Sequence, residues 1–145
     1  MKQILLFIYL IMAAVLPADT VYAEPIPSFI EPRQVIFSMT GSSEEEINHI
    51  LSSANNVLKA YGPENVEMRI VAYYHGIRGL LKKNKDTALR VRVLMQYNVE
   101  FIACGNTMKT KKIDKSELIE GTEIVTAGIV EMIERVQEGW VYIKP

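Results

Sequence analysis

The chain has 145 residues, 49% of them hydrophobic, and a formal net charge of −1 at neutral pH. This length and composition fit one globular domain with a sizeable core. A near-neutral chain lacks the basic field that nucleic-acid binding requires, so we exclude that class of protein.

The first 23 residues carry the pattern of a secretory signal peptide. Lys2 precedes an apolar run over residues 4–16, and Val21 and Ala23 fit the cleavage rule for the −3 and −1 positions. The run of 13 apolar residues is shorter than a bilayer span of roughly 20, which argues against a stable membrane anchor. We therefore expect a mature chain that begins at Glu24 and is periplasmic or secreted.

The mature chain opens with a predicted extended leader over residues 24–32, which holds three prolines, and a first strand over residues 34–38. Ser42 and Ser43 each stand three residues before a glutamate, and this capping-box pattern predicts the start of a helix. The helix is amphipathic because apolar residues recur at steps of three and four up to Gly62. Its predicted apolar face comprises Ile47, Ile50, Leu51, Ala54, Val57, Leu58 and Tyr61.

The rest of the chain alternates predicted strands and helices. Further strands are predicted at residues 66–73, 99–103, 122–125 and 140–144, and helical segments at 77–83, 87–97, 115–119 and 128–138. The apolar stripes of the two longer helices comprise Leu89, Val93, Leu94 and Tyr97, and Ile129, Met132, Ile133 and Val136. This alternation predicts an α/β fold in which helices flank a mostly parallel sheet of five strands, in an order that spacing does not reveal.

The only cysteine, Cys104, follows the predicted strand at residues 99–103. In open parallel sheets, reactive groups gather at the carboxyl ends of the strands. Gly105 lets backbone N–H groups approach the sulfur, and a basic run at residues 109–112 follows, so both features favour a thiolate. A single cysteine in an exported chain cannot form a disulfide within the chain. It indicates a reactive thiol or a disulfide to another molecule, and the alternative is a buried, inert cysteine.

A second group of candidates follows the strand at residues 66–73. His75 is a candidate base for the thiol, and Tyr73 and Tyr74 are candidates to line a pocket, although a turn role and packing roles are the alternatives. Metal chemistry is not expected, because the chain has two histidines, His49 and His75, without the spacing of a metal motif. The glycines form no phosphate-binding loop, so we expect no nucleotide cofactor.

Three stretches of the sequence resemble the DsrE/DsrF-like family, in its small exported branch. Residues 99–108 match its pattern V-x-F-x-A-C-x-N-T-M, and residues 128–145 resemble its closing A-G-V-V-E … G-x-x-Y-I-K-P. Residues 71–78 resemble its second-strand loop, but Tyr73-Tyr74-His75-Gly76 replaces the small residues of many relatives and would alter a pocket beside the thiol.

The resemblance implies a three-layer α/β/α domain over residues 33–145 with a parallel five-stranded sheet. It also implies homotrimers or hexamers, which agrees with a closing strand too apolar for an open sheet edge. Better-studied relatives relay sulfur as a persulfide on a cysteine. By analogy, the resemblance implies this role for Cys104 alone. The expected site residues are Cys104 and His75 for chemistry, and Tyr73, Tyr74, Gly76, Gly105, Asn106 and Thr107 for substrate binding.

Three functions remain open on the sequence. The first is a sulfur-handling protein, a persulfide carrier or sulfurtransferase-like protein, which exchanges sulfur with a donor or acceptor protein because the chain has no second cysteine. The second is a non-catalytic oligomeric module that binds a small ligand, with Cys104 as a wall residue. The third is a thiol redox sensor. An exposed thiol of low pKa would favour a carrier, whereas a buried and inert thiol would favour a binding module.

Overall fold

A computed structural model describes residues 19–145. Most of the predicted signal peptide therefore lies outside the described residues. Residues 19–32 contain no helix or strand, and the folded domain begins at Arg33. Within residues 19–145, no helix combines the length and the apolar character needed to cross a membrane.

The centre of the fold is a five-stranded sheet in the order β4-β3-β2-β1-β5, and every neighbouring pair is parallel. Its strands are β1 (Arg33–Met39), β2 (Val66–Ala72), β3 (Val99–Cys104), β4 (Glu123–Val125) and β5 (Val141–Ile143). The predicted fold class is confirmed, and the order, which the sequence left open, makes β2 and β3 neighbours. Ala72 pairs with Ala103 at the end of this ladder, so Tyr73 and Cys104 follow side by side.

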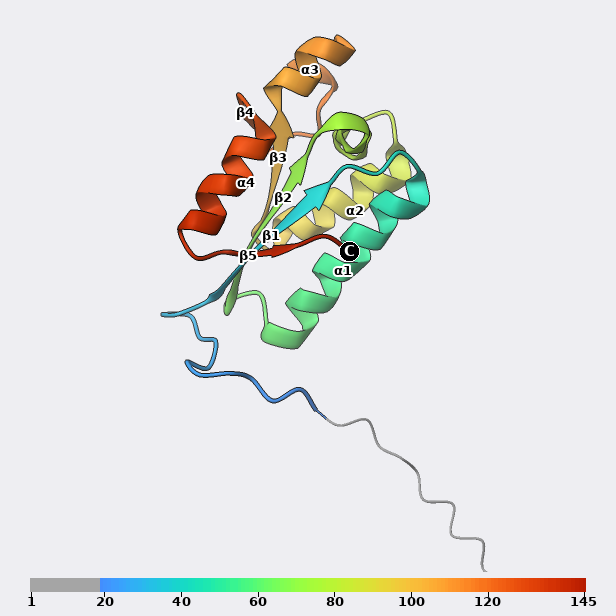
Figure 1. The fold of residues 1–145 in the computed structure, drawn as a ribbon. Helices are drawn as coiled ribbons and strands as arrows, with labels where there is room; N and C mark the ends of the chain where they lie inside the picture. Colours follow the sequence, from blue (N-terminus) through green and yellow to red (C-terminus); the bar gives the residue numbers. More distant parts are fainter. Residues whose placement is uncertain (1–18) are drawn as a thin grey trace, which may run out of the picture.

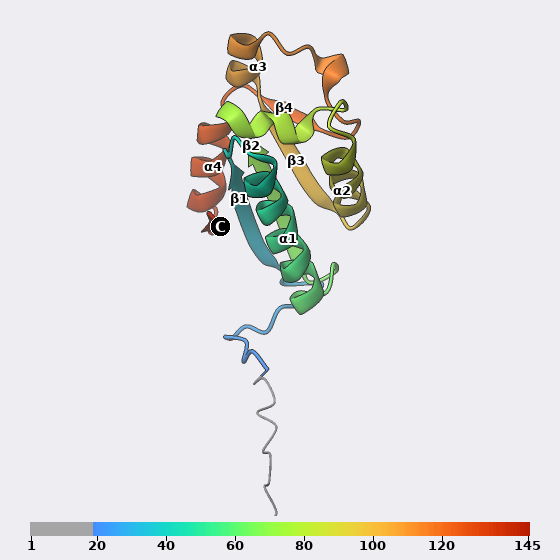
Figure 2. The same ribbon diagram turned by 90° about the vertical axis from the view of Figure 1, so that its right-hand side faces the viewer.

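Helices cover both faces of the sheet and make the three layers (Figures 1 and 2). The larger core lies beneath α1 (Glu44–Tyr61) and α2 (Lys85–Gln96), and a smaller one lies beneath α4 (Gly128–Gln137) alone. Arg69 of β2 forms ion pairs with Glu100 of β3 and Glu131 of α4, which fixes α4 to the sheet.

The start of α1 follows the predicted capping pattern, and Ser43 is the residue that caps it. The Ser43 hydroxyl accepts a hydrogen bond from the Glu46 N–H at 3.1 Å, and the Glu46 carboxylate accepts from the Ser43 N–H at 2.9 Å. The buried residues of α1 are Ile47, Ile50, Leu51, Ala54 and Leu58, as predicted, with Val57 and Tyr61 partly buried against them.

The prediction that the apolar stripes of the other two long helices face the core is largely wrong. In α2 the buried residues are Thr87, Ala88, Val91 and Leu94, whereas Leu89, Val93 and Tyr97 are exposed. The smaller Ala88 and Val91 face the sheet because α2 packs close to both α1 and β3. In α4 only Gly128 and Met132 are buried, and Ile129, Ile133 and Val136 remain exposed because a single helix lies on this face.

Three short helices occupy the carboxyl edge of the sheet. The helix α3 (Gly105–Lys111) follows Cys104 directly, in a segment where the sequence pattern predicted no helix. Two 3-10 helices, η1 (Tyr74–Leu80) and η2 (Lys115–Glu117), replace the helical segments predicted at residues 77–83 and 115–119. The early start of η1 depends on Gly76, because a Cβ atom there would lie 2.0 Å from the Met39 carbonyl oxygen.

Candidate functional site

The thiol of Cys104 lies at the carboxyl edge of the sheet, on the face that α4 covers. Cys104 ends β3 and is the N-cap residue of α3. A Cβ atom built on Gly128, the first residue of α4, would lie 3.2 Å from the Cys104 Cβ and 3.7 Å from the Tyr73 Cβ. The side chains of Cys104 and Tyr73 therefore share the space beside the start of α4, and only glycine fits at position 128.

Two opposing effects act on this thiol. Burial raises the pKa of Cys104, because the side chain is only 6% exposed and a low dielectric disfavours the thiolate. Hydrogen bonds from the Gly128 N–H, from the side chain and backbone of Thr107, and from the Asn106 N–H outweigh burial, so the pKa lies below its ordinary value. The arrangement therefore favours the thiolate, which is the nucleophilic form of cysteine.

Thr107 connects the thiol to the neighbouring loop. Its hydroxyl oxygen accepts a hydrogen bond from the Tyr74 N–H at 3.1 Å, which leaves the hydroxyl hydrogen free for the sulfur. The Cys104 side chain makes no capping hydrogen bond to α3. The Asn106 N–H, which also donates to the Thr126 carbonyl at 3.0 Å, contributes least to the shift in the pKa.

Hydroxyl groups line the same face next to the thiol. Burial raises the pKa of Tyr73, and the nearby Tyr142 and Cys104 raise it further. The Tyr142 hydroxyl lies 2.9 Å from Oγ of Ser38, which is buried at the end of β1. Sequence reasoning missed Gly128, Ser38 and Tyr142, because only the strand order brings α4 to Cys104 and brings β1 and β5 to the side of Tyr73.

His75 does not contact these groups and lies in a cluster on the rim. Its ring stacks near Tyr74 with centroids 3.9 Å apart, and its Nδ1 lies 3.5 Å from Nζ of Lys111. Lys111 also lies 5.7 Å from the centre of the Tyr74 ring. Neither His75 nor a lysine is among the groups that lower the pKa of Cys104. The role of His75 in activating the thiol stays a prediction.

The predicted glycines have packing roles that the structure makes plain. Gly76 is buried against the end of β1, and a Cβ atom on Gly105 would lie 3.0 Å from the Val125 carbonyl oxygen. Asn106 is exposed and Thr107 half-buried at the start of α3. Substrate binding by these residues stays a prediction, as it does for Tyr73 and Tyr74.

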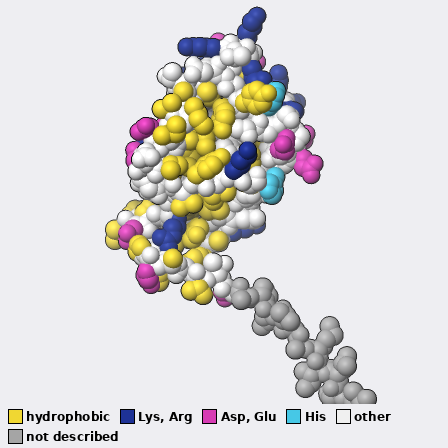
Figure 3. Space-filling model, in the orientation of Figure 1, with side chains coloured by type: hydrophobic (Ala, Val, Ile, Leu, Met, Phe, Trp, Pro, Cys, Tyr) yellow, Lys and Arg dark blue, Asp and Glu magenta, His cyan; other side chains and the backbone are white. Residues whose placement is uncertain are grey.

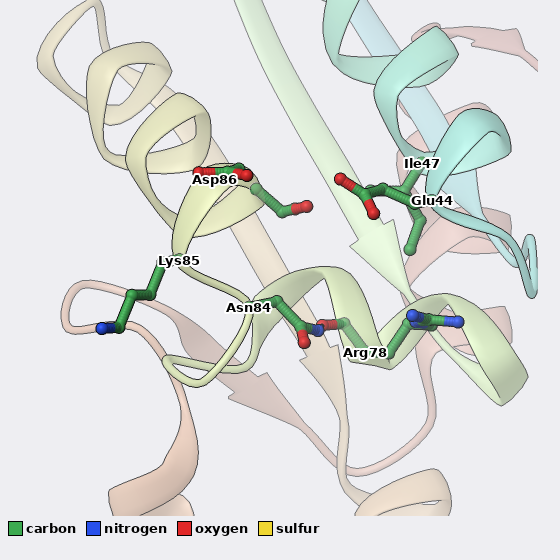
Figure 4. Close-up of a pocket in the computed structure, with 7 residues that line it drawn as sticks. Glu44, Ile47, Arg78, Asn84, Lys85 and Asp86 are labelled. Carbon is green, nitrogen blue, oxygen red and sulfur yellow. The ribbon is translucent and has the colours of Figure 1, made fainter.

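A second hollow lies on the same edge, between the starts of α1 and α2 (Figure 4). Arg78 lines it and donates a hydrogen bond to the Ser42 carbonyl, and Glu44 and Asp86 place carboxylates on its two sides. Lys82 donates to the Ser116 carbonyl at 2.9 Å. Arg78 and Lys82 therefore bind backbone carbonyls and do not serve the thiol. No group of three or more metal-ligating side chains forms within the described part of the chain.

Comparisons with known proteins agree with this geometry. The model of the DsrE/DsrF-like family matches residues 33–145. The solved structure of MTH1491, a protein of unknown function from Methanobacterium thermoautotrophicum, is similar at 28% identity and a TM-score of 0.73, over 78% of this chain and 99% of that one. The ychN protein from E. coli has the same fold at 18% identity and a TM-score of 0.69, with the same coverage of both chains. No curated protein sequence matches.

Proposed function

This chain belongs to the DsrE/DsrF-like family, and we propose that it is a sulfur-handling protein that carries sulfur as a persulfide on Cys104. The family is generally linked to sulfur relay. The observation that carries the proposal is the set of hydrogen-bond donors around the Cys104 sulfur, which lower its pKa although the side chain is buried. A cysteine that served only as packing would have no need of them.

The proposed reaction is a transfer of sulfane sulfur. The Cys104 thiolate attacks the terminal sulfur of a polysulfide, the donor's S–S bond breaks, and the shortened polysulfide leaves with both bonding electrons. The product is a Cys104 persulfide anion, and no external oxidant is needed. The Gly128 N–H and the Thr107 hydroxyl, which favour the thiolate, are placed to stabilise this second sulfur anion in the same way.

The sequence has no second cysteine, and this determines how the sulfur leaves the Cys104 persulfide. No thiol of the same chain can attack the persulfide and release its sulfur as part of a disulfide. The outer sulfur must therefore pass to another molecule, which makes the protein a carrier or a sulfurtransferase. We further propose that it works outside the cytoplasm, after cleavage of its signal peptide, with a donor and an acceptor in the same compartment.

One observation favours the alternative of a non-catalytic binding module. Cys104 is 6% exposed, so only a narrow approach leads to the sulfur, as expected for a wall residue of a ligand pocket. A thiol redox sensor would share the lowered pKa but would form a mixed disulfide instead of retaining sulfur. The three functions thus differ in what Cys104 binds and in whether it reacts at all.

Cyanide distinguishes them, because it removes the outer sulfur of a persulfide as thiocyanate and regenerates the thiol. The purified protein is treated with polysulfide, freed of excess reagent and then mixed with cyanide. We expect thiocyanate from the wild type and none from Cys104→Ser. If the wild type yields no thiocyanate although iodoacetamide alkylates Cys104 readily, the persulfide-carrier function is contradicted. A thiol that resists both reagents would favour the binding module.

A further inference from the structure

The helix that follows Cys104 carries a cluster of exposed positive charges. Residues 105–113 contain Lys109, Lys111 and Lys112 but no aspartate or glutamate. All three lysines are exposed. The helix α3 projects beyond the carboxyl ends of the strands, so this lysine cluster stands clear of the body of the fold (Figures 1 and 2).

The charges of the lysine cluster are not neutralised within residues 19–145. The ion pairs there involve Arg69 and Arg135, and no carboxylate lies within ion-pair distance of the cluster. Since the whole chain has a net charge of only −1, the cluster is a local excess and not a reflection of overall composition. Lys and Arg side chains stand out at this end of the molecule (Figure 3).

An exposed aromatic ring connects the lysine cluster to the thiol. Tyr74 is 61% exposed beside Lys111, and its left-handed backbone (φ 54°) is held by the hydrogen bond from its N–H to Thr107. Thr107 in turn serves the Cys104 thiolate. Tyrosine is enriched among the residues that contribute most to binding at protein interfaces, and exposed charges of one sign steer a partner of opposite charge.

We propose that Tyr74 and the lysine cluster form a docking surface for an acidic segment of a partner protein, whose sulfur they bring to Cys104. This inference rests on the proposed function, because it identifies the partner in the sulfur transfer. The lysines are exposed at the far end of α3 and Cys104 is buried at its start, so a molecule that contacts both must extend along the helix. Seven helical residues span about 10 Å, which suits several side chains of a peptide better than one small anion.

Synthetic peptides with one cysteine serve as probes of this surface. Acidic, neutral and basic peptides of equal length are prepared as mixed disulfides with thionitrobenzoate. The Cys104 thiolate attacks the peptide sulfur, a disulfide to the peptide forms, and the coloured thionitrobenzoate anion leaves with the electrons of the broken bond. The rate of colour formation reports docking. At low ionic strength we expect the acidic peptide to react about tenfold faster than the basic one.

Charge reversal of the cluster supplies the matched comparison. Lys109→Glu with Lys111→Glu should reverse the order of the peptides, and Lys109→Gln with Lys111→Gln should abolish the preference. The control pair, Lys59→Glu with Arg92→Glu, changes the net charge equally on exposed positions of α1 and α2, and should keep the wild-type order. Iodoacetamide, which is uncharged, should alkylate Cys104 at one rate in all variants.

Several results would overturn the docking surface. The first is that the charge-reversed variant still reacts with the peptides in the wild-type order of rates. The second is that the control pair changes this order as much as the charge reversal does. The third is that the rate of alkylation by iodoacetamide falls only in the charge-reversed variant. If the charge reversal lowers the rate of polysulfide uptake as much as it lowers the rate with the acidic peptide, the lysine cluster binds small anions and is not a docking surface for a peptide. If the wild type prefers the acidic peptide but retains no sulfur from polysulfide, the docking surface stands and the sulfur-carrier function fails.

Discussion

At the scale of single residues, the lowered pKa of Cys104 depends on donors that the fold holds in place. The Gly128 N–H belongs to the first turn of α4, and the Thr107 hydroxyl is held in place by the Tyr74 N–H. Such fixed dipoles stabilise a buried anion without the reorganisation that a flexible lysine would require. The lowered pKa of Cys104 therefore comes from the backbone N–H groups and the Thr107 hydroxyl around it, not from the basic residues that follow in sequence.

Thr107→Val should weaken the thiolate. The variant keeps the shape of the side chain but removes a hydrogen bond to a charged group, which contributes about 1.5 kcal/mol. We expect alkylation of Cys104 by iodoacetamide to slow by about tenfold near neutral pH, with a pH profile displaced to higher pH. Thr110→Val is the matched control, because the Thr110 hydroxyl donates to the Asn106 carbonyl on the same helix. Equal profiles for both variants would contradict the role of Thr107.

The sequence predicts this site only in part, for a reason that particular residues illustrate. The position of Cys104 at the end of a strand follows from the chain itself, and so does its place on the carboxyl edge. Gly128 and Tyr142 come from other segments. Gly128 reaches the thiol because β4 lies beside β3, and Tyr142 lies near Tyr73 because β1 and β5 follow β2 in the sheet. Local pattern carries no information on that order, so these partners could not be predicted.

At the scale of elements, α1 shows how far local signals determine structure. Its capping box, its first-turn acids and its apolar stripe all indicate the same helix, and its core face is the one predicted. The helix α3 lacks such signals, since seven residues form barely two turns and Gly105 opens them. Gly105 packs closely against the end of β4, a tertiary contact that sequence periodicity does not reveal.

Ser43→Ala tests the capping box of α1. Loss of the hydroxyl leaves the Glu46 N–H without its acceptor, and we expect the free energy of unfolding to fall by about 1 kcal/mol. Urea denaturation followed by circular dichroism measures the change. Ser42→Ala is the control, because the hydroxyl of Ser42 does not cap the helix. A larger loss from Ser42→Ala would mean that α1 begins one residue earlier.

At the scale of the whole molecule, the face around α4 exposes many apolar side chains. Ile129, Ile133 and Val136 are each more than 40% exposed, and the edge strand β5 exposes Val141 and Tyr142. Hydrophobic side chains gather on this face (Figure 3), whereas the opposite face of the sheet has two helices over it. A large exposed apolar patch of this kind marks an interaction surface.

We propose that copies of the chain associate through this face as a homotrimer or hexamer. Ile133→Glu places a charge within the apolar surface and should reduce the molar mass measured by light scattering to that of a monomer. Leu89→Glu introduces the same charge at an exposed leucine on the opposite layer and should leave the assembly intact. A wild type that is monomeric at micromolar concentration would contradict the proposal.

Export makes a prediction for the native chain. Protein isolated from its own host should begin at Glu24, since Val21 and Ala23 satisfy the cleavage rule behind a short apolar run. N-terminal sequencing of the extracytoplasmic fraction measures this directly. A chain that retains Met1 and fractionates with the cytosol would contradict export and would move the proposed sulfur chemistry into the cytoplasm.

The most direct test of sulfur carriage is the intact mass of the protein after exposure to polysulfide. The wild type should gain one sulfur atom, on the order of 32 Da, and should lose it again on treatment with a reductant. Cys104→Ser, treated in parallel, should keep its original mass. A wild type whose mass remains unchanged under native conditions, while the same sample denatured in urea gains the sulfur, would show that the folded protein shields Cys104 and does not carry sulfur.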